Sequence, residues 1–356
     1  MVAKRRQSPV APAPRRYDLV ERCLAEYKAM TVEALIAGIP TTEPRRYLYD
    51  LVPLYPLRPG KGFRPGLCLA TCGAFGGEPR AALNSAVALE LFHNAFLVHD
   101  DVEDGSLSRR GQPTLAAEHG LAIAVNVGDA MNVLSIEPLM QNLETLGHDV
   151  TWDVFVEIQH MVKQSVEGQA MELGWVRDNS CRLDDDDYLR MTLKKTCWYT
   201  CIHPCRIGAL VADGSNRDLD RFNRFGFFMG AAFQIQDDLL NLVGDRRRYG
   251  KEIGGDVWEG KRTLMLIHVL NSASDEEHAR LRRFLEKPRA NRSATDIRWV
   301  YRLMSKYGSV DYGRERAREL AEGAQAEFEI AYADAPLGDD RAFIEQIVFY
   351  MVQRDV

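Results

Sequence analysis

The chain has 356 residues with 46% hydrophobic composition, enough to bury a large core, and nothing in it requires a division into several domains. Its formal net charge of −6 lacks the basic surplus expected of a nucleic-acid-binding protein and argues against that class. No apolar run reaches the ~18 residues of a membrane-spanning helix, and the N-terminus lacks the apolar core of a secretory signal. We therefore expect a cytoplasmic protein without stable membrane insertion.

Residues 1–16 are rich in Pro and Ala and contain no acids, which predicts a disordered basic tail. We expect residues 17–356 to form one folded domain. The first helix is predicted to begin near Tyr17 and to end before Gly38 and Pro40.

The next feature is a loop at residues 56–65, PLRPGKGFRP, which carries Arg58, Lys61 and Arg64 among two glycines and three prolines. This composition disfavours a helix but can present cations on a fixed backbone. Phosphate binding is one use of such a loop. Taken alone, the loop favours the other interpretation, a surface turn with incidental charge.

Residues 97–111, LVHDDVEDGSLSRRG, place four acids within five residues and two arginines shortly after them. If residues 85–104 are helical, as their apolar texture without Pro or Gly suggests, Asp100 and Asp104 are one turn apart and share a face. Oxygen ligands a turn apart suit Mg²⁺, which takes one or two carboxylates and completes its shell with water and phosphate. A solvated acidic helix end is the alternative.

A second acidic motif, DDLLN at residues 237–241, ends another helical run predicted at 225–242, and a basic loop follows it as arginines follow the first. The pair favours a metal and phosphate site over two incidental helix ends. A third acidic run, Asp184–Asp187, precedes a helical pattern, and we interpret it as a helix start, where acids oppose the helix dipole.

The remaining patterns have three- and four-residue apolar spacing without β-branched alternation, so the predicted fold class is all-α. Seven cysteines, an odd number, fit reduced thiols better than a disulfide framework. Cys197, Cys201 and Cys205 share one helical stripe, but their spacing matches no usual zinc pattern, and we interpret them as buried thiols. Further helices are predicted at residues 116–146, 153–172, 188–212, 299–307 and 314–332, with a charged connector at 272–293.

These ordered motifs resemble those of the trans-isoprenyl diphosphate synthases, the short-chain polyprenyl synthetases that elongate allylic diphosphates with isopentenyl diphosphate. The resemblance covers nearly the whole chain. The residues that carry it are Gly60-Lys61, Arg64-Pro65, His93, Asp100–Asp104, Arg109-Arg110-Gly111, Gly168-Gln169, Lys195-Thr196, Phe233–Asn241, Lys251, Asp256 and Lys261. Two positions depart from the family pattern: Gly62 stands where a second cation is usual, which puts one diphosphate contact in doubt, and Asn241 replaces the commoner Asp but keeps an oxygen.

The resemblance implies an all-α fold, a single large helical bundle of the isoprenoid synthase type with a central active-site cavity, and a homodimer. It implies a catalytic set of Asp100, Asp101, Asp104, Asp237, Asp238 and Lys195. Three Mg²⁺ ions would be held by Asp100, Asp104 and Asp237. Arg109, Lys195 and Lys251 would bind the allylic diphosphate, with Thr196, Gln234 and Lys261 nearby, and isopentenyl diphosphate would be bound by Lys61, Arg64, His93 and Arg110.

Product length can be argued from the helix of the first motif. Phe96 is one turn and Phe92 two turns below Asp100, on the stripe along which a growing chain must descend. Phe96 is expected to obstruct, while Ala95 is expected to leave space beside it, where family members that make farnesyl diphosphate carry a second aromatic. We therefore expect geranylgeranyl diphosphate, with farnesyl diphosphate next. The alternative is that both phenylalanines only pack in the core.

Other function classes are weaker. A class I terpene cyclase shares the first motif and the ionisation chemistry, but it has no need of the cations at Lys61 and Arg64. An HD-type metallophosphohydrolase needs more histidine ligands than the eight scattered ones here provide. A catalytically silent partner subunit of a synthase typically lacks one aspartate motif, and this chain keeps both.

Overall fold

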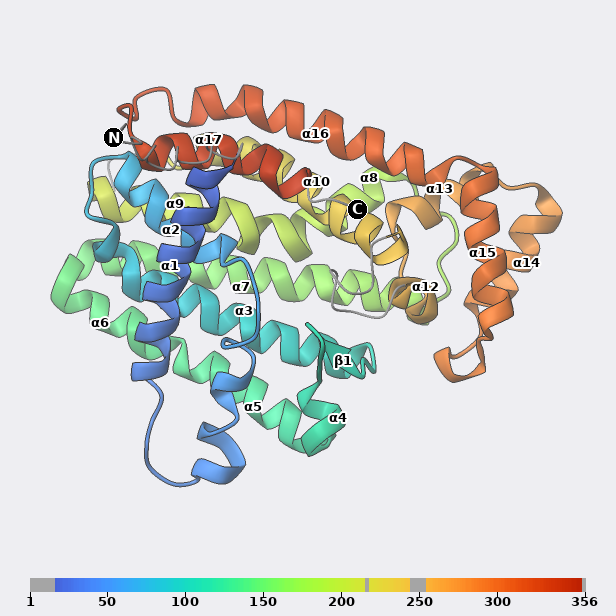
Figure 1. The fold of residues 1–356 in the computed structure, drawn as a ribbon, viewed down its shortest axis with the longest axis horizontal. Coiled ribbons are helices and arrows are strands. Elements are labelled where there is room, and N and C mark those ends of the chain that lie inside the picture. Colours follow the sequence, from blue (N-terminus) through green and yellow to red (C-terminus); the bar gives the residue numbers. More distant parts are fainter. Residues whose placement is uncertain (1–16, 215–217, 244–253, 354–356) are drawn as a thin grey trace, which may run out of the picture.

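The computed structural model describes residues 17–214, 218–243 and 254–353. Within them the chain is almost entirely helical, which confirms the predicted all-α class (Figure 1). The strands in this part of the chain form one short antiparallel hairpin of β1 (Ser108–Arg109) and β2 (Gln112–Pro113). The basic tail predicted at residues 1–16 lies outside the described residues.

Helices of the first half are α1 (Asp18–Ala37), α2 (Phe63–Ala74), α3 (Leu83–Glu103), α4 (Leu115–His119), α5 (Leu121–Leu134), α6 (Ile136–Leu146) and α7 (His148–Arg177). Those of the second half are α8 (Asp185–Thr192), α9 (His203–Asp213), α10 (Arg221–Val243), α12 (Gly255–Glu259), α13 (Leu264–Ser272), α14 (Asp275–Leu285), α15 (Ala294–Lys306), α16 (Ser309–Ala331) and α17 (Asp339–Val352). Shorter turns of 3-10 or π type are η1 (Arg45–Tyr49), η2 (Val52–Leu54), η3 (Pro79–Ala82), η4 (Leu193–Ile202) and η6 (Arg289–Asn291).

Two predicted helices are interrupted, each for a local reason. The run predicted at 116–146 is divided into α4, α5 and α6, and the first break is at Gly120, whose φ of 88° is a left-handed value that a helix cannot contain. The run predicted at 188–212 widens into the π-helical turn η4. Such widened turns are frequent at functional sites.

The acidic run Asp184–Asp187 starts α8, as predicted. Asp184 accepts a hydrogen bond from the backbone N–H of Asp187 at 2.9 Å, and the Asp187 carboxylate accepts one from the Asp184 N–H at 3.3 Å. This capping box satisfies two helix-end donors. These acids therefore have a structural role.

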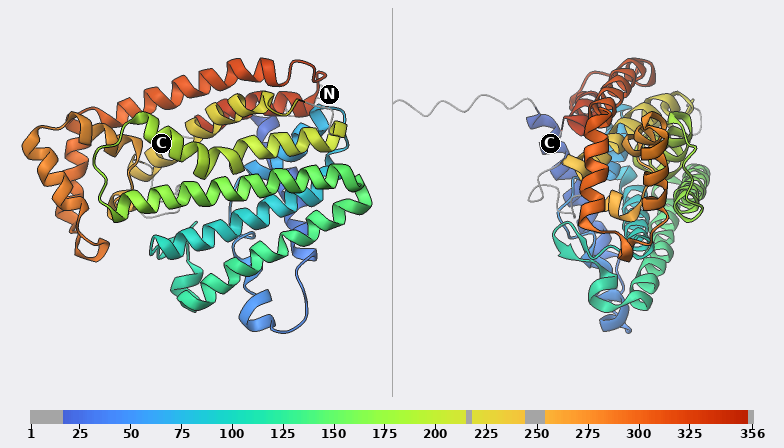
Figure 2. Two further views of the ribbon diagram at one scale, coloured as in Figure 1. Left: turned by 180° about the vertical axis from the view of Figure 1, so that it is seen from behind. Right: turned by 90° about the vertical axis from the view of Figure 1, so that its right-hand side faces the viewer.

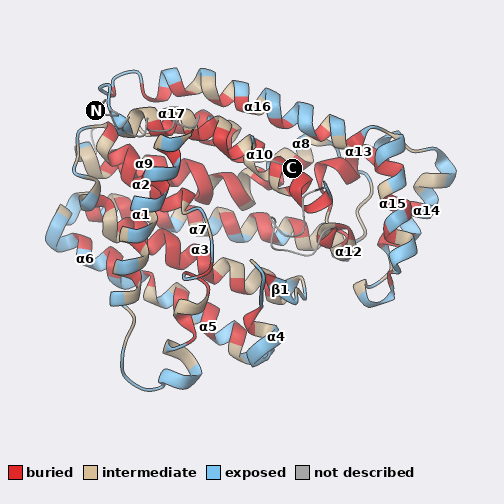
Figure 3. Cartoon of the chain, in the orientation of Figure 1, coloured by how far each residue is buried: buried red, intermediate tan, exposed pale blue. Residues whose placement is uncertain are grey.

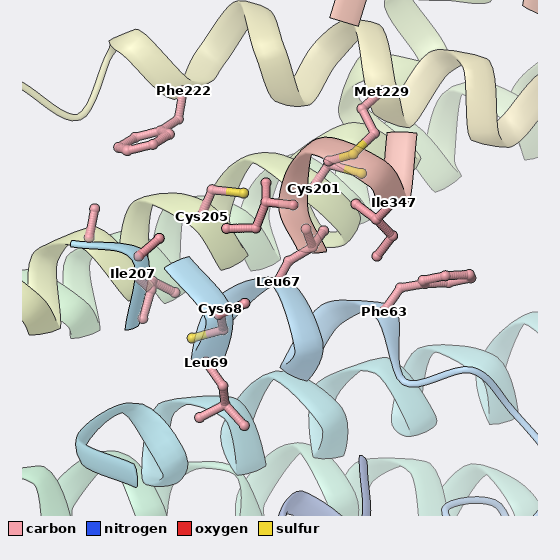
Figure 4. Packing of buried hydrophobic residues seen from close by; sticks show 14 of the residues in the cluster. Phe63, Leu67, Cys68, Leu69, Cys201, Cys205, Ile207, Phe222, Met229 and Ile347 are labelled. Atoms are coloured by element: carbon pink, nitrogen blue, oxygen red, sulfur yellow. The ribbon is translucent and has the colours of Figure 1, made fainter. Parts of the chain in front are cut away.

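The core lies where α2, α3, α9 and α10 meet, and the buried faces of these helices form a continuous layer (Figure 3). α2 lies between α3 and α9, and α10 lies between η4 and α16. The 30-residue α7 runs along the length of the molecule beside η4 (Figure 2). Cys68, Cys201 and Cys205 are buried in this core among Leu67 and Ile207 (Figure 4). These cysteines are free thiols.

The helix that carries the first acidic motif is itself a core element. Residues Pro79–Glu103 are long and apolar enough to cross a membrane by length and composition, but 72% of the apolar window is buried inside the protein. Polar and charged residues such as Asn84, Glu90 and His93 interrupt its apolar run, so no membrane span is predicted from the sequence here. Its burial is that of a core helix, and it brings the acids at its C-terminal end to a defined position.

Candidate active site

A cavity of about 1110 Å³ lies at the end of α3 that carries the first acidic motif. Residues of α1, the 56–62 loop, α2, α3, η4, α10, α17 and the 256–263 segment line it. The predicted site residues in its wall are Lys61, Arg64, His93, Phe96, Asp100, Arg109, Arg110, Lys195, Thr196, Gln234, Asp237, Asp238 and Lys261. Lys251 lies outside the described residues.

The first acidic motif ends α3, as predicted, with Asp104 as the C-cap. Asp100 lines the cavity, whereas the Asp104 carboxylate accepts a hydrogen bond from Lys261 Nζ at 2.6 Å. Burial and then the neighbouring charge of Asp100 raise the pKa of Asp104 to about 7, although Lys261 opposes the rise. The two carboxylates are therefore close enough to repel each other and to attract a cation.

Asp101 faces away from the cavity and is almost completely buried, with 1% of its surface exposed. Both of its carboxylate oxygens accept hydrogen bonds from Arg109 Nε at 2.8 Å, and Arg109 also reaches the Asp100 carboxylate at 2.9 Å. Burial alone would lower the pKa of Arg109, but these two carboxylates outweigh it and raise the pKa. Asp101 thus fixes an arginine in the wall instead of reaching the cavity as its predicted catalytic role would require.

The second acidic motif is on α10, one turn before its end. Asp237 and Asp238 both line the cavity, and Asp238 accepts hydrogen bonds of 2.8 Å from Gln234 and from the hydroxyl of Tyr188. Burial raises the pKa of Asp238 to about 7 against the effect of these two donors. Gln234 in turn accepts a hydrogen bond from Thr196 at 2.8 Å.

Lys195 lies between the two acidic motifs. Its ammonium group contacts the carboxylates of Glu172 and, at 3.5 Å, Asp100. Burial acts to lower the pKa of Lys195, but Glu172 and Asp100 reverse this and raise it, so the group is a fixed cation. Gln169 bonds Glu103 at 2.5 Å and Asp100 at 3.5 Å, which orients the first motif from α7.

A second group of cations lies near the start of α2. Helix α2 begins at Phe63, inside the predicted loop, because Gly62 adopts a left-handed φ of 69° that turns the chain into the helix. Lys61 is exposed in the loop and donates a hydrogen bond to Tyr350 at 2.8 Å, whereas Arg64 is buried in the first turn of the helix.

The Arg64 guanidinium contacts His93 Nε2 at 3.3 Å, donates to Thr200 at 2.8 Å and lies 4.2 Å above the ring of Tyr199. Burial, followed by the charges of Arg64 and Arg110, lowers the pKa of His93 well below its usual value. His93 is therefore neutral, accepts from Arg64 at Nε2, and carries its proton on Nδ1. Within the described part of the chain, that buried Nδ1 has no hydrogen-bond partner.

Arg58 and Arg110 have different roles from each other. Arg58 is buried, lies 4.1 Å above the Tyr55 ring and donates to the backbone oxygens of Arg109 and Pro113, so it ties the loop to the hairpin. Arg110 lines the cavity, and burial lowers its pKa, with Glu90 as the charge that opposes this effect.

Sequence reasoning missed several residues of the cavity wall. Glu90 is one turn before His93 and Glu172 one turn after Gln169, so helix periodicity could have identified both. No local signal marks the others, because they come from distant elements. These other residues are Lys28, Tyr188, Tyr199 and Tyr350.

The residues proposed to set chain length lie on different faces of α3. Phe96 lines the cavity, and Phe92 lies one turn deeper with its ring centroid 5.7 Å from that of Phe96. The Tyr199 ring is 5.8 Å from Phe96, so it forms the facing wall. Ala95 does not border this space. It is fully buried in a separate cluster with Val98 and residues of α5, which contradicts the expectation that it leaves room in the channel.

The donors available for a metal ion are carboxylate oxygens of Asp100, Asp104 and Asp237. Among the described residues, no three His, Cys, Asp or Glu side chains are grouped so that they alone could hold an ion. This arrangement fits Mg²⁺, which binds through one or two carboxylates and takes its other ligands from water and substrate phosphate. It does not fit a structural metal site closed by protein ligands.

Comparison with known proteins agrees with this geometry. The sequence model of the polyprenyl synthetase family matches residues 46–304. The geranylgeranyl diphosphate synthase of Mycobacterium tuberculosis is 32% identical over 296 residues, which cover 81% of this chain and 79% of that protein. The octaprenyl diphosphate synthase of Escherichia coli is 30% identical over 297 residues, which cover 83% of this chain and 86% of that protein. The crystal structure of the geranylgeranyl pyrophosphate synthetase of Pyrococcus horikoshii superposes with a TM-score of 0.82 at 28% identity, covering 95% of this chain and 99% of that one.

Proposed function

The chain belongs to the polyprenyl synthetase family and is a prenyltransferase, and we propose that it condenses isopentenyl diphosphate with an allylic diphosphate to give geranylgeranyl diphosphate. The observation that supports this best is the content of one cavity: two acidic motifs on α3 and α10, and two separate groups of cations. A reaction that joins two diphosphates needs two anion pockets around one carbon chain. A terpene cyclase, which takes one diphosphate, needs only one of them.

The allylic diphosphate is assigned to the acidic side of the cavity. Splitting an allylic carbon–oxygen bond leaves a carbocation and a diphosphate, so positive charge placed at the leaving group lowers the barrier. Bound Mg²⁺, held by Asp100, Asp104 and Asp237, would supply part of that charge. Arg109 and Lys195 supply the rest from the protein, because both are held in place by carboxylates before substrate arrives.

The isopentenyl diphosphate is assigned to Lys61, Arg64, His93 and Arg110 near the start of α2. The Nδ1–H of His93, for which the described residues offer no acceptor, adds a donor to the three cations. Burial of Arg64 and Arg110 strengthens their attraction for a diphosphate because the surrounding dielectric is low.

The double bond of isopentenyl diphosphate then attacks the carbocation, and the released diphosphate accepts the proton that is lost. The residues assigned to the reaction contain no paired nucleophile and base of the kind found in covalent catalysis, which agrees with a reaction in which the protein supplies charge and orientation. Thr196 and Gln234 bond each other in the cavity wall, on the side assigned to the allylic diphosphate.

The product length is proposed to be set at Phe96. Phe96, stacked against Phe92 and facing Tyr199, limits the channel about one turn below Asp100. The relatives include a geranylgeranyl and an octaprenyl synthase at nearly the same identity, so identity alone does not choose the length. Farnesyl diphosphate, one five-carbon unit shorter, is the second candidate.

The partner in solution is proposed to be a second copy of the chain. Large apolar side chains are exposed along three adjacent helices, α5, α6 and α7, which form one face of the molecule. A patch of this kind on a protein without membrane-spanning function is typical of a protein interface. Its most exposed members are Leu121, Val133, Ile136, Met140, Trp152, Val156 and Val166. A homodimer of this kind in the cytoplasm fits the family.

The experiment that tests the function is product analysis. Purified protein is incubated with Mg²⁺, isopentenyl diphosphate and each of dimethylallyl, geranyl and farnesyl diphosphate, and the dephosphorylated products are sized by chromatography. Linear alcohols ending at twenty carbons support the proposal. Cyclic hydrocarbons formed without isopentenyl diphosphate would identify a cyclase, and no product with any starter would identify a silent subunit.

A further inference from the structure

In each acidic motif two aspartates are adjacent, and helix geometry separates adjacent side chains by about 100°. Both members of such a pair therefore cannot point in the same direction. The first member lines the cavity in both motifs, as Asp100 and Asp237, and the second member borders it in the α10 motif alone, as Asp238. The second members, Asp101 and Asp238, are 1% and 6% exposed. A buried carboxylate without donors is costly, so each needs a partner.

In both motifs that partner is a buried tyrosine from a distant segment. The Tyr55 hydroxyl donates to Asp101 Oδ2 at 2.5 Å across 46 positions of sequence. The Tyr188 hydroxyl donates to Asp238 Oδ2 at 2.8 Å across 50 positions. Each tyrosine is 1% exposed, and burial raises the pKa of both, so each remains a hydrogen-bond donor.

We propose that Tyr55 and Tyr188 are positioning residues for the prenyl transfer assigned above, each fixing the second aspartate of one motif and, through it, a side chain of the cavity wall: Arg109 in the first motif and Gln234 in the second. This inference rests on the proposed function. Neither tyrosine acts on substrate in it, and each acts through the aspartate that it bonds.

The first of these chains runs from Tyr55 through Asp101 and Arg109 to Asp100. Asp101 receives Arg109 Nε at 2.8 Å on both oxygens, and Arg109 Nη2 continues to Asp100 at 2.9 Å. Tyr55 is itself fixed, because the Arg58 guanidinium lies 4.1 Å above its ring and the Leu115 backbone N–H points at its oxygen at 3.4 Å. Arg109 is therefore held by hydrogen bonds to both Asp100 and Asp101.

The second chain runs from Tyr188 through Asp238 and Gln234 to Thr196. Asp238 receives the Gln234 amide at 2.8 Å, and the Gln234 oxygen accepts the Thr196 hydroxyl at 2.8 Å. Thr196 is next to Lys195, the cation that contacts Asp100 at 3.5 Å. The first chain thus ends on the Asp100 carboxylate, and the second ends on Thr196 in the cavity wall.

The test uses Tyr55→Phe and Tyr188→Phe, which keep the ring and remove only the hydroxyl. Tyr307→Phe is the matched control, because Tyr307 donates a 2.5 Å hydrogen bond to Glu277 on α14, outside the cavity. We expect the kcat/KM for the allylic diphosphate to fall about tenfold in both variants, with the KM for isopentenyl diphosphate unchanged and the control at wild-type rates. If binding of both substrates is weakened by the same factor, or if kcat/KM does not fall, the proposal is overturned.

A binding measurement separates this proposal from the proposed function. Calorimetric titration with Mg²⁺ and inorganic pyrophosphate requires no turnover, and Tyr55→Phe is expected to weaken that binding about tenfold. Unchanged affinity overturns the positioning role even in an active enzyme, while an inactive wild type bears on the proposed function alone. If a variant unfolds, the affinity for Mg²⁺ and pyrophosphate is measured for Asp101→Asn alone and for the double variant Asp101→Asn, Tyr55→Phe. A further loss of affinity in the double variant contradicts a chain through Asp101.

Discussion

Replacing Phe96 by alanine is expected to lengthen the product. The ring of Phe96 is the large side chain nearest to the metal-binding end of α3 on the cavity face, and its neighbours on either side are Phe92 and Tyr199. Truncation removes contacts with two rings but no hydrogen bond. The next obstacle is Phe92, four residues deeper, which is about 6 Å along the helix axis.

The expected sizes follow from this geometry. A further ~6 Å of channel is room for at least one additional five-carbon unit, so the main product should move from geranylgeranyl diphosphate to longer chains. Phe→Ala at a fully buried site costs about 3–5 kcal/mol of folding free energy, and the half-buried Phe96 should cost less. The variant should therefore remain folded and active.

The assay is chromatography of dephosphorylated products made under excess isopentenyl diphosphate, together with thermal unfolding of the variant. Phe92→Ala provides the comparison, because that ring is behind Phe96 and its loss alone should leave the product length unchanged. A folded, active Phe96→Ala enzyme with wild-type products would refute the reasoning. The channel floor would then be on another element, with Tyr199 as the first candidate.

Three other outcomes are expected. Asp100→Ala and Asp237→Ala should each raise the activation free energy by at least the ~2.7–4 kcal/mol of one lost electrostatic contact, and so lower kcat. Circular dichroism should show that both variants stay helical. A kcat near that of the wild type would contradict the metal assignment. Ala95→Phe should reduce stability by about 1–3 kcal/mol in urea unfolding without shortening products, because residue 95 packs against α5. Burial lowers the pKa of His203 to about 4. Between about pH 6.5 and about pH 4 the unfolded chain therefore binds a proton at this residue that the native state does not bind. The free energy of unfolding should fall as the pH drops from about 6.5 to about 4. His203→Gln should flatten that part of the pH profile of unfolding free energy, and an unchanged profile would mean that other groups cause it.

The helical class and the acidic ends of α3 and α10 could be predicted because both depend on local periodicity. Apolar spacing defines a helix, and a turn of helix places Asp100 and Asp104 on one side whatever the rest of the chain does. The π-helical turn at 193–202 and the break at Gly120 were not predicted. The first has no signature in apolar spacing, and the second depends on a single glycine conformation.

Which of two adjacent aspartates faces the cavity could not be predicted, because that direction is set by packing between distant segments. Asp101 turns inward because Tyr55 and Arg109 provide its donors, and neither is its neighbour on the helix. Ala95 shows the same limit. Ala95 is next to Phe96 in the sequence, but its face of α3 packs against α5 in the core and does not border the channel.

The central claim is that one cavity binds two diphosphates through two different groups of cations. The measurement that tests it most directly is the KM for both substrates in Lys61→Ala and in Lys195→Ala. Lys61→Ala should raise the KM for isopentenyl diphosphate and leave that for the allylic diphosphate near wild type, while Lys195→Ala should do the reverse. If each variant raises both KM values by the same factor, the two groups of cations do not form separate pockets and the account is wrong.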